Sequence, residues 1–128
     1  MQTNKLIISI NKPIHEVFLF TITPPNSKYW IPGISNETTN ELSIRTGTVY
    51  TLMRTTGESF KVTLTDFKQD KMITFISTDK NYHCRYTYNS LDEKSCKLEY
   101  YEWVDKGELD EPFTLAVLEK LKSVLEAL

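Results

Sequence analysis

Tyrosines recur at alternate positions late in the chain, where residues 82–88 read Tyr-His-Cys-Arg-Tyr-Thr-Tyr. Side chains two apart in an extended strand point to the same face of a sheet, so Tyr82, Tyr86 and Tyr88 share one face. Each offers an apolar ring and a hydroxyl tip that can orient a ligand, and the pattern therefore favours a cavity with an aromatic wall. The alternative is a core that these rings simply fill. Three aromatic residues on other segments extend the same face: Tyr100, Phe60 and Phe75.

An acid-base candidate follows Tyr100 by two positions. Glu102 shares the strand parity of Tyr100, so an undisturbed strand would turn it toward the same cavity. Burial would raise the pKa of its carboxyl and make it a plausible general acid or base. A twist or bulge near residues 101–103 would instead place Glu102 in water, and we expect this outcome because isolated carboxylates are rarely buried. His15 and His83 fall on the polar faces of their segments and offer no general base.

Other residues with potential chemistry give weaker signals. Trp30 stands in a stiff loop, where it can close the mouth of a cavity or anchor the neighbouring helical segment, and the sequence does not separate these roles. Cys84 and Cys96 are expected to be buried, reduced thiols that pack as small hydrophobes. No closely spaced cysteine or histidine pairs predict a metal site, and no phosphate-binding loop occurs. We therefore expect no metal and no cofactor.

Composition excludes several classes of partner. Fifteen basic and 17 acidic side chains give a net charge of −2, and the lysines are scattered singly, so we expect no nucleic-acid binding. The first residues lead straight into a strand rather than a secretion signal, and no segment reaches the roughly 20 apolar residues that span a bilayer. These features predict a cytoplasmic protein with no membrane span. The length of 128 residues predicts a single domain over 1–128. The oligomeric state cannot be predicted.

The order of elements predicts an α+β fold. Pro13 starts a short amphipathic helix that Pro24 and Pro25 stop. A long amphipathic helix over 112–128 ends the chain, with Asp110 as its expected N-cap. Between the helices, consecutive strands joined by short turns must be antiparallel, and their apolar face needs a cover that only the last helix can provide. We expect a curved antiparallel sheet of six to seven strands wrapped around this helix. The expected strands are 5–11, 34–42, 48–55, 60–65, 72–78, 82–88 and 95–104.

Four segments of the chain resemble the START-like superfamily, also called SRPBCC, and in particular its small bacterial polyketide-cyclase/dehydratase-like branch. Residues 8–18, Ile-Ser-Ile-Asn-Lys-Pro-Ile-His-Glu-Val-Phe, are similar to the family's opening strand and proline-led helix. Trp-Ile-Pro-Gly-Ile at 30–34 resembles its tryptophan segment, Gly-Thr-Val-Tyr at 47–50 its glycine-led strand, and 112–128 its closing helix. The resemblance implies the helix-grip fold and a cavity for lipids, sterols, polyketides or other hydrophobic ligands.

These features lead to one functional expectation and two alternatives. We expect a binding or carrier domain for a hydrophobic or aromatic small molecule held between the sheet and the C-terminal helix. The first alternative is a cyclase, dehydratase or isomerase that uses Glu102 or a tyrosine hydroxyl, and the sequence does not decide whether the protein is an enzyme. The second is a chaperone-associated protein-interaction domain. The expected cavity residues are Trp30, Phe60, Val62, Phe75, Tyr82, Tyr86, Tyr88, Tyr100, Phe113, Val117 and Leu121.

Overall fold

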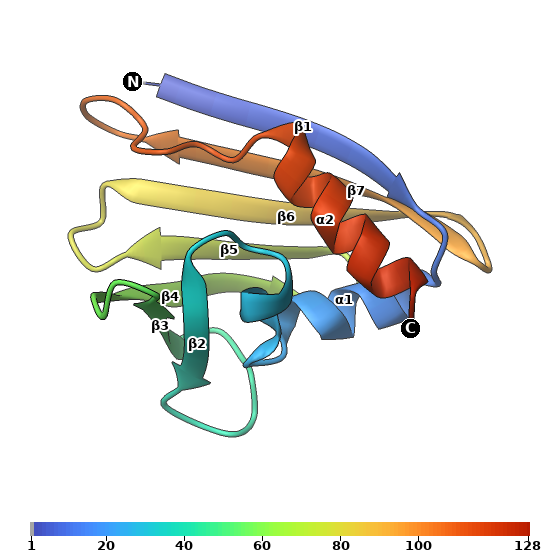
Figure 1. The fold of residues 1–128 in the computed structure, drawn as a ribbon, viewed down its shortest axis with the longest axis horizontal. Coiled ribbons are helices and arrows are strands. Elements are labelled where there is room, and N and C mark those ends of the chain that lie inside the picture. The colour runs from blue at the N-terminus through green and yellow to red at the C-terminus, as the bar shows by residue number, and fades with distance from the viewer. Residues whose placement is uncertain (1) are drawn as a thin grey trace.

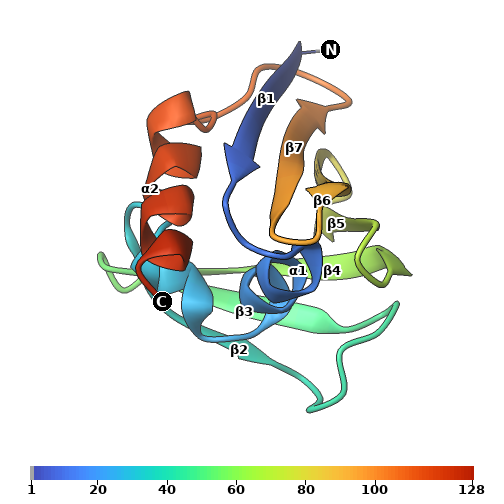
Figure 2. The same ribbon diagram turned by 90° about the vertical axis from the view of Figure 1, so that its right-hand side faces the viewer.

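A seven-stranded antiparallel sheet forms the framework of the computed structural model, which describes residues 2–128. Its strand order is β1-β7-β6-β5-β4-β3-β2, so β2 to β7 form a meander and β1 pairs with the last strand. The sheet curls strongly, and strands near its two edges run in clearly different directions (Figure 2). The predicted α+β fold is confirmed. The strands are β1 (Gln2–Ile10), β2 (Ile34–Thr39), β3 (Val49–Arg54), β4 (Ser59–Lys68), β5 (Met72–Ser77), β6 (Tyr82–Asp92) and β7 (Ser95–Val104).

Three helical segments lie on the concave side of the sheet (Figure 1). Helix α1 (Ile14–Ile22) begins directly after Pro13, whose fixed φ and missing N–H suit the start of a helix. The 3₁₀ helix η1 (Asn26–Tyr29) follows, and α2 (Leu115–Glu126) crosses the sheet near β1 and β7. Among the described residues, no helix has the length and apolar character that crossing a membrane requires.

Helix α2 is shorter than the predicted segment 112–128. It starts at Leu115, preceded by an extended Thr114. The reason lies one residue earlier, because the backbone N–H and C=O of Phe113 are bonded to Glu102 and Asn4 of the sheet. A residue held at both polar groups by the sheet is not free to join the first helical turn.

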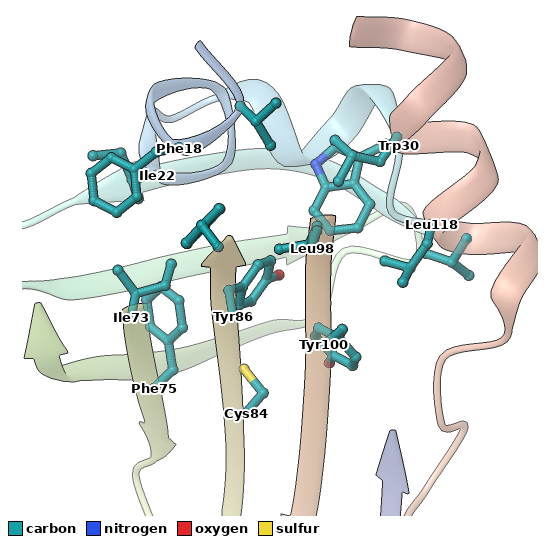
Figure 3. Packing of buried hydrophobic residues seen from close by; sticks show 14 of the residues in the cluster. Phe18, Ile22, Trp30, Ile73, Phe75, Cys84, Tyr86, Leu98, Tyr100 and Leu118 are labelled. Carbon is teal, nitrogen blue, oxygen red and sulfur yellow. The ribbon is translucent and has the colours of Figure 1, made fainter. Parts of the chain in front are cut away.

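The apolar stripe of α2 closes the core. Val117, Leu118, Leu121 and Leu125 are buried against the sheet, as the helical spacing predicts. Leu128, the last residue of the segment predicted to be helical, is 74% exposed because the helix stops before it. Figure 3 shows side chains from β5, β6, β7 and α2 converging in this core.

Candidate functional site

A cavity of about 940 Å³ opens between the concave face of the sheet, α2 and the loop that joins β7 to α2. Its walls come from residues far apart in the sequence, since β3, β4, β5, β6 and β7 each contribute a side chain from the same face of the sheet. Eight of the residues expected at the cavity line it: Phe60, Val62, Phe75, Tyr82, Tyr86, Tyr100, Phe113 and Val117.

The aromatic wall is built from rings in edge-to-face and stacked contact. Tyr86 meets the edge of Tyr100 with centroids 5.2 Å apart, and Phe75 contacts both Tyr86 and Tyr50 edge-on. Phe113 stacks on Tyr100 at 4.5 Å with an angle of 10° between the planes. Such pairs add stability beyond simple burial, so the wall is held in place by its own contacts. Tyr86, Tyr100, Phe75 and Cys84 can be followed in Figure 3.

Three of the expected residues lie outside the cavity. Tyr88 points toward α1, where its hydroxyl is 2.6 Å from that of Thr21 and its ring meets the edge of Phe18. Leu121 is fully buried on the face of α2 that packs against the sheet. Trp30 packs behind the wall, edge-on to both Tyr86 and Phe113, and its buried Nε1 has no partner among residues 2–128. Trp30 borders a separate depression of about 410 Å³ between residues 28–34 and the start of α2.

Glu102 lines the cavity and is only 2% exposed. The expectation that it faces water was therefore wrong. No bulge interrupts β7 at this point, because Glu102 stays in register with Asn4 of β1 and with Cys84 of β6. The strand parity that it shares with Tyr100 is thus preserved, and both side chains turn inward.

Four donors surround the carboxyl of Glu102. The side-chain amide of Asn4 and the backbone N–H of Phe113 each donate to Oε2 at 2.8 Å. The hydroxyl of Tyr82 donates to Oε1 at 2.7 Å, and that of Tyr100 lies 3.4 Å from the same oxygen. Four donors match the acceptor sites of an ionised carboxylate, which can only accept. Glu102 is therefore saturated by its surroundings and ties the sheet to the loop before α2.

A second carboxyl, Glu37 of β2, lies on the cavity wall and is only 7% exposed. Its two oxygens accept hydrogen bonds from the hydroxyl of Ser27 at 2.9 Å and from the backbone N–H of the same residue at 3.3 Å. Burial raises the pKa of Glu37 above its ordinary value, and the bonds from Ser27 offset this only in part. Glu37 is thus less completely bonded than Glu102 and better suited to exchange a proton.

Sequence reasoning missed Glu37 because β2 has no regular alternation. Ile34 and Glu37 are both buried although they are three residues apart, and a register shift between Ile34 and Asn36 accounts for this. A bulge of this kind turns a side chain to the opposite face, and the polar sequence of β2 does not predict one.

Three further polar groups line the wall. Tyr50 donates from its hydroxyl to the backbone oxygen of Ile22 at 2.6 Å, and burial raises its pKa. Burial likewise raises the pKa of the Cys84 thiol to about 12, which keeps it neutral and a poor nucleophile. Arg54 also lines the cavity, with its guanidinium 4.7 Å from the centre of the Phe60 ring.

The histidines lie away from the cavity. His15 is bonded to Asp70 at 2.8 Å on the surface. His83, as its parity predicts, is on the outer face of the sheet, stacked on Trp103 and bonded to Asp105. Within residues 2–128, no group of three or more His, Cys, Asp or Glu side chains is placed to hold a metal ion.

A family model described as a domain of unknown function (DUF3284) matches residues 4–121. No curated protein matches the chain. Among solved structures, the protein XoxI from Bacillus cereus superimposes with a TM-score of 0.77 at 16% identity, covering 98% of this chain and 96% of that chain. A START superfamily protein from Mycobacterium smegmatis does so with a TM-score of 0.74 at 12% identity, covering 98% and 97% of the two chains.

A more distant similarity is to BexL, described as a di-domain ARO/CYC protein from the BE-7585A biosynthetic pathway. It superimposes with a TM-score of 0.65 at 12% identity, covering 81% of this chain and 36% of that chain. At such identities these similarities show the fold alone. The predicted START-like, helix-grip fold is confirmed.

Proposed function

The chain belongs to the DUF3284 family and has a START-like fold, and from this premise we propose that it binds a hydrophobic or aromatic small molecule in the cavity between the sheet and α2. The observation that carries the proposal is the cavity itself. At about 940 Å³ it falls within the range of small-molecule sites, and its wall combines aromatic rings with a few fixed polar groups, as such sites do.

The way in which the wall is held also supports binding. Tyr82 and Tyr100 are bonded into the network around Glu102, and Tyr50 is bonded to the backbone of α1. Rings that are fixed before a ligand arrives lose little conformational freedom when it binds, so more of the contact energy remains as affinity. This feature supports a preformed binding site over a core that the aromatic rings fill incompletely.

Ligand-dependent thermal unfolding tests the proposal. The protein is screened against fatty acids, sterols, flavonoids, aromatic amines and linear polyketide mimics. A ligand at about one hundred times its dissociation constant should add roughly 2.7 kcal/mol to the free energy of unfolding. That corresponds to a rise of several degrees in Tm for a domain of this size. A saturable rise confined to one chemical class supports the proposal, and the absence of any rise across all classes contradicts it.

Glu37 favours a second candidate function, acid-base catalysis of the cyclase, dehydratase or isomerase type. Its carboxyl lies on the cavity wall, and burial raises its pKa above the ordinary value, which suits a group that takes and gives a proton during catalysis. Glu102, already bonded to four donors, then serves to position the tyrosines. The test is whether a ligand found in the screen is converted, and whether Glu37→Gln abolishes its conversion without abolishing its binding.

A further inference from the structure

The hydroxyl protons of Tyr82 and Tyr100 are committed to a single network. Tyr82 Oη lies 2.7 Å from Glu102 Oε1 and 3.0 Å from Tyr100 Oη. In the first of these contacts the hydroxyl of Tyr82 donates to the carboxyl of Glu102. Because Tyr82 has only one proton, Tyr100 must be the donor in the contact between the two tyrosines, and its proton is shared between Tyr82 Oη and Glu102 Oε1 at 3.4 Å. Tyr82 and Tyr100 can therefore only accept hydrogen bonds from a ligand.

Glu102 keeps this orientation fixed. The amide of Asn4 donates both to Glu102 and to the backbone oxygen of Phe113, and these two acceptors determine which side-chain atom of Asn4 is the nitrogen. With the Asn4 amide and the Phe113 N–H both donating to Oε2, that oxygen must act as an acceptor. The hydrogen bonds at both carboxyl oxygens therefore run toward Glu102, from Asn4 and Phe113 at Oε2 and from Tyr82 and Tyr100 at Oε1.

Glu37 likewise presents hydrogen-bond acceptors, on the other side of the cavity. Both of its oxygens accept from Ser27, and each keeps a further acceptor site. None of the ion pairs formed among residues 2–128 includes Glu37 or Glu102. A buried carboxylate without a cation is costly, and a ligand that brings a positive charge removes that cost.

Near the mouth of the cavity, acidic side chains outnumber basic ones. The acidic residues that line the cavity, besides the two buried ones, are Asp79, Glu108, Asp110 and Glu111. Arg54 and Lys61 are the opposing bases, and the guanidinium of Arg54 already lies over the ring of Phe60. Acidic walls of low dielectric constant attract cations and repel anions.

We infer that the ligand is an apolar, preferably aromatic, body that carries a protonated amine, with the amine directed at Glu37. This inference rests on the proposed function and specifies its ligand class. A ligand whose only polar group is a carboxylate would face the carboxyls of Glu37 and Glu102, and its only charged partners on the wall would be Arg54 and Lys61.

Three probes with one shared apolar body test the inference: naphthylmethylammonium, naphthylmethanol and naphthoate. Their dissociation constants are measured by calorimetric titration of the full chain. The ammonium compound should bind at least tenfold more tightly than the carboxylate, with the neutral alcohol between them. Ethylammonium, which lacks the apolar body, should not bind measurably. This comparison needs only the unmodified protein, so it does not depend on any variant folding.

The variant Glu37→Gln then tests whether Glu37 causes the preference for the ammonium probe. The amide keeps an oxygen for Ser27, and the variant should bind the ammonium probe about tenfold more weakly, with affinity for the alcohol changed by less than about twofold. Glu119→Gln, which removes the same charge from the exposed face of α2, should leave all three affinities unchanged.

Equal or tighter binding of naphthoate overturns the inference and leaves the proposed function intact. An ammonium preference that survives in Glu37→Gln overturns the assignment to Glu37. Failure of all three probes overturns the inference, and only an additional failure of the wider ligand screen counts against the proposed function.

Discussion

The backbone N–H of Phe113 donates to Oε2 of Glu102 at 2.8 Å, joining a buried carboxyl on β7 to the loop that leads into α2. The same carboxyl accepts from Tyr82 of β6 and from Asn4 of β1. Three strands and the loop before α2 therefore meet at one side chain. Glu102 is best understood as the residue that sets the width of the cavity at this end.

Replacing Glu102 with glutamine should destabilise the protein. The glutamine amide group would face at least one donor, and it cannot accept from Asn4, Phe113 and Tyr82 together. Buried donors left without an acceptor cost about 1–3 kcal/mol, and we expect a loss of this size in the free energy of unfolding measured with urea. Glu99→Gln is the matched control, because Glu99 lies on the opposite face of β7, 4.0 Å from Lys5. A surface pair of this kind contributes little. Equal effects of the two substitutions would contradict the role given to Glu102.

Glu37 should make stability fall as the pH rises. Its pKa is raised in the folded protein above the ordinary value of 4.5, so the folded state holds this proton more tightly than the unfolded chain does. The resulting stabilisation is fully present below about pH 4.5 and is lost as the pH rises through the folded-state pKa. Glu37→Gln removes this dependence and should be more stable than the wild type at pH 7. Urea unfolding at intervals between pH 4 and 8 measures the difference, and a wild type that gains stability relative to Glu37→Gln across this interval would show that the sign is wrong.

Tyr88→Phe should lower the stability of the protein without changing its affinity for a ligand. Its hydroxyl pairs with that of Thr21, which lines the cavity while Tyr88 itself does not, so the loss of this bond should lower the free energy of unfolding by roughly 0.5–1.5 kcal/mol. Because Tyr88 does not line the cavity, the affinity for any ligand from the screen should change by less than about twofold. A large loss of affinity with unchanged stability would mean that the cavity extends further toward α1 than the structure places it.

Val62→Trp should block the cavity without unfolding the protein. Val62 is half-buried on β4 and lines the cavity, so an indole there has empty volume to occupy. We expect Tm to stay the same or rise and ligand affinity to fall at least tenfold. Thr63→Trp is the control, since the neighbouring residue points to the outer face of the sheet. The cavity is not the binding site if both variants bind equally well.

The sheet could be predicted because its strands alternate regularly. Over 82–88 of β6 and 96–100 of β7 every second residue is apolar or aromatic, and the structure buries Cys84, Tyr86, Leu98 and Tyr100 as that alternation requires. Antiparallel order followed from the short turns. The same parity places Glu102 inward. The expectation that Glu102 faces water was wrong because it relied only on the general rarity of buried carboxylates. The four donors that satisfy Glu102 come from β1, β6, β7 and the loop before α2, and no local sequence signal reveals them.

The extent of the cavity could not be predicted from parity. Tyr86 and Tyr88 share a face and differ by one pleat, yet only Tyr86 lines the cavity, because α1 covers the sheet beside Tyr88. Leu121 shares the stripe of α2 with Val117 but lies where the helix meets the sheet closely. Where helices touch a sheet and where they leave a gap depends on their tertiary placement, and periodicity carries no information about that.

The central claim, that a small molecule binds between the sheet and α2, is tested most directly by methyl NMR during titration with the tightest ligand from the screen. Methyl groups of Ile34, Leu52, Val62 and Val117 line the cavity, whereas Ile7, Leu19 and Leu91 are exposed elsewhere. The account predicts saturable, one-to-one shifts in the first set and little change in the second. Shifts confined to the exposed set, or changes that do not saturate, would contradict it.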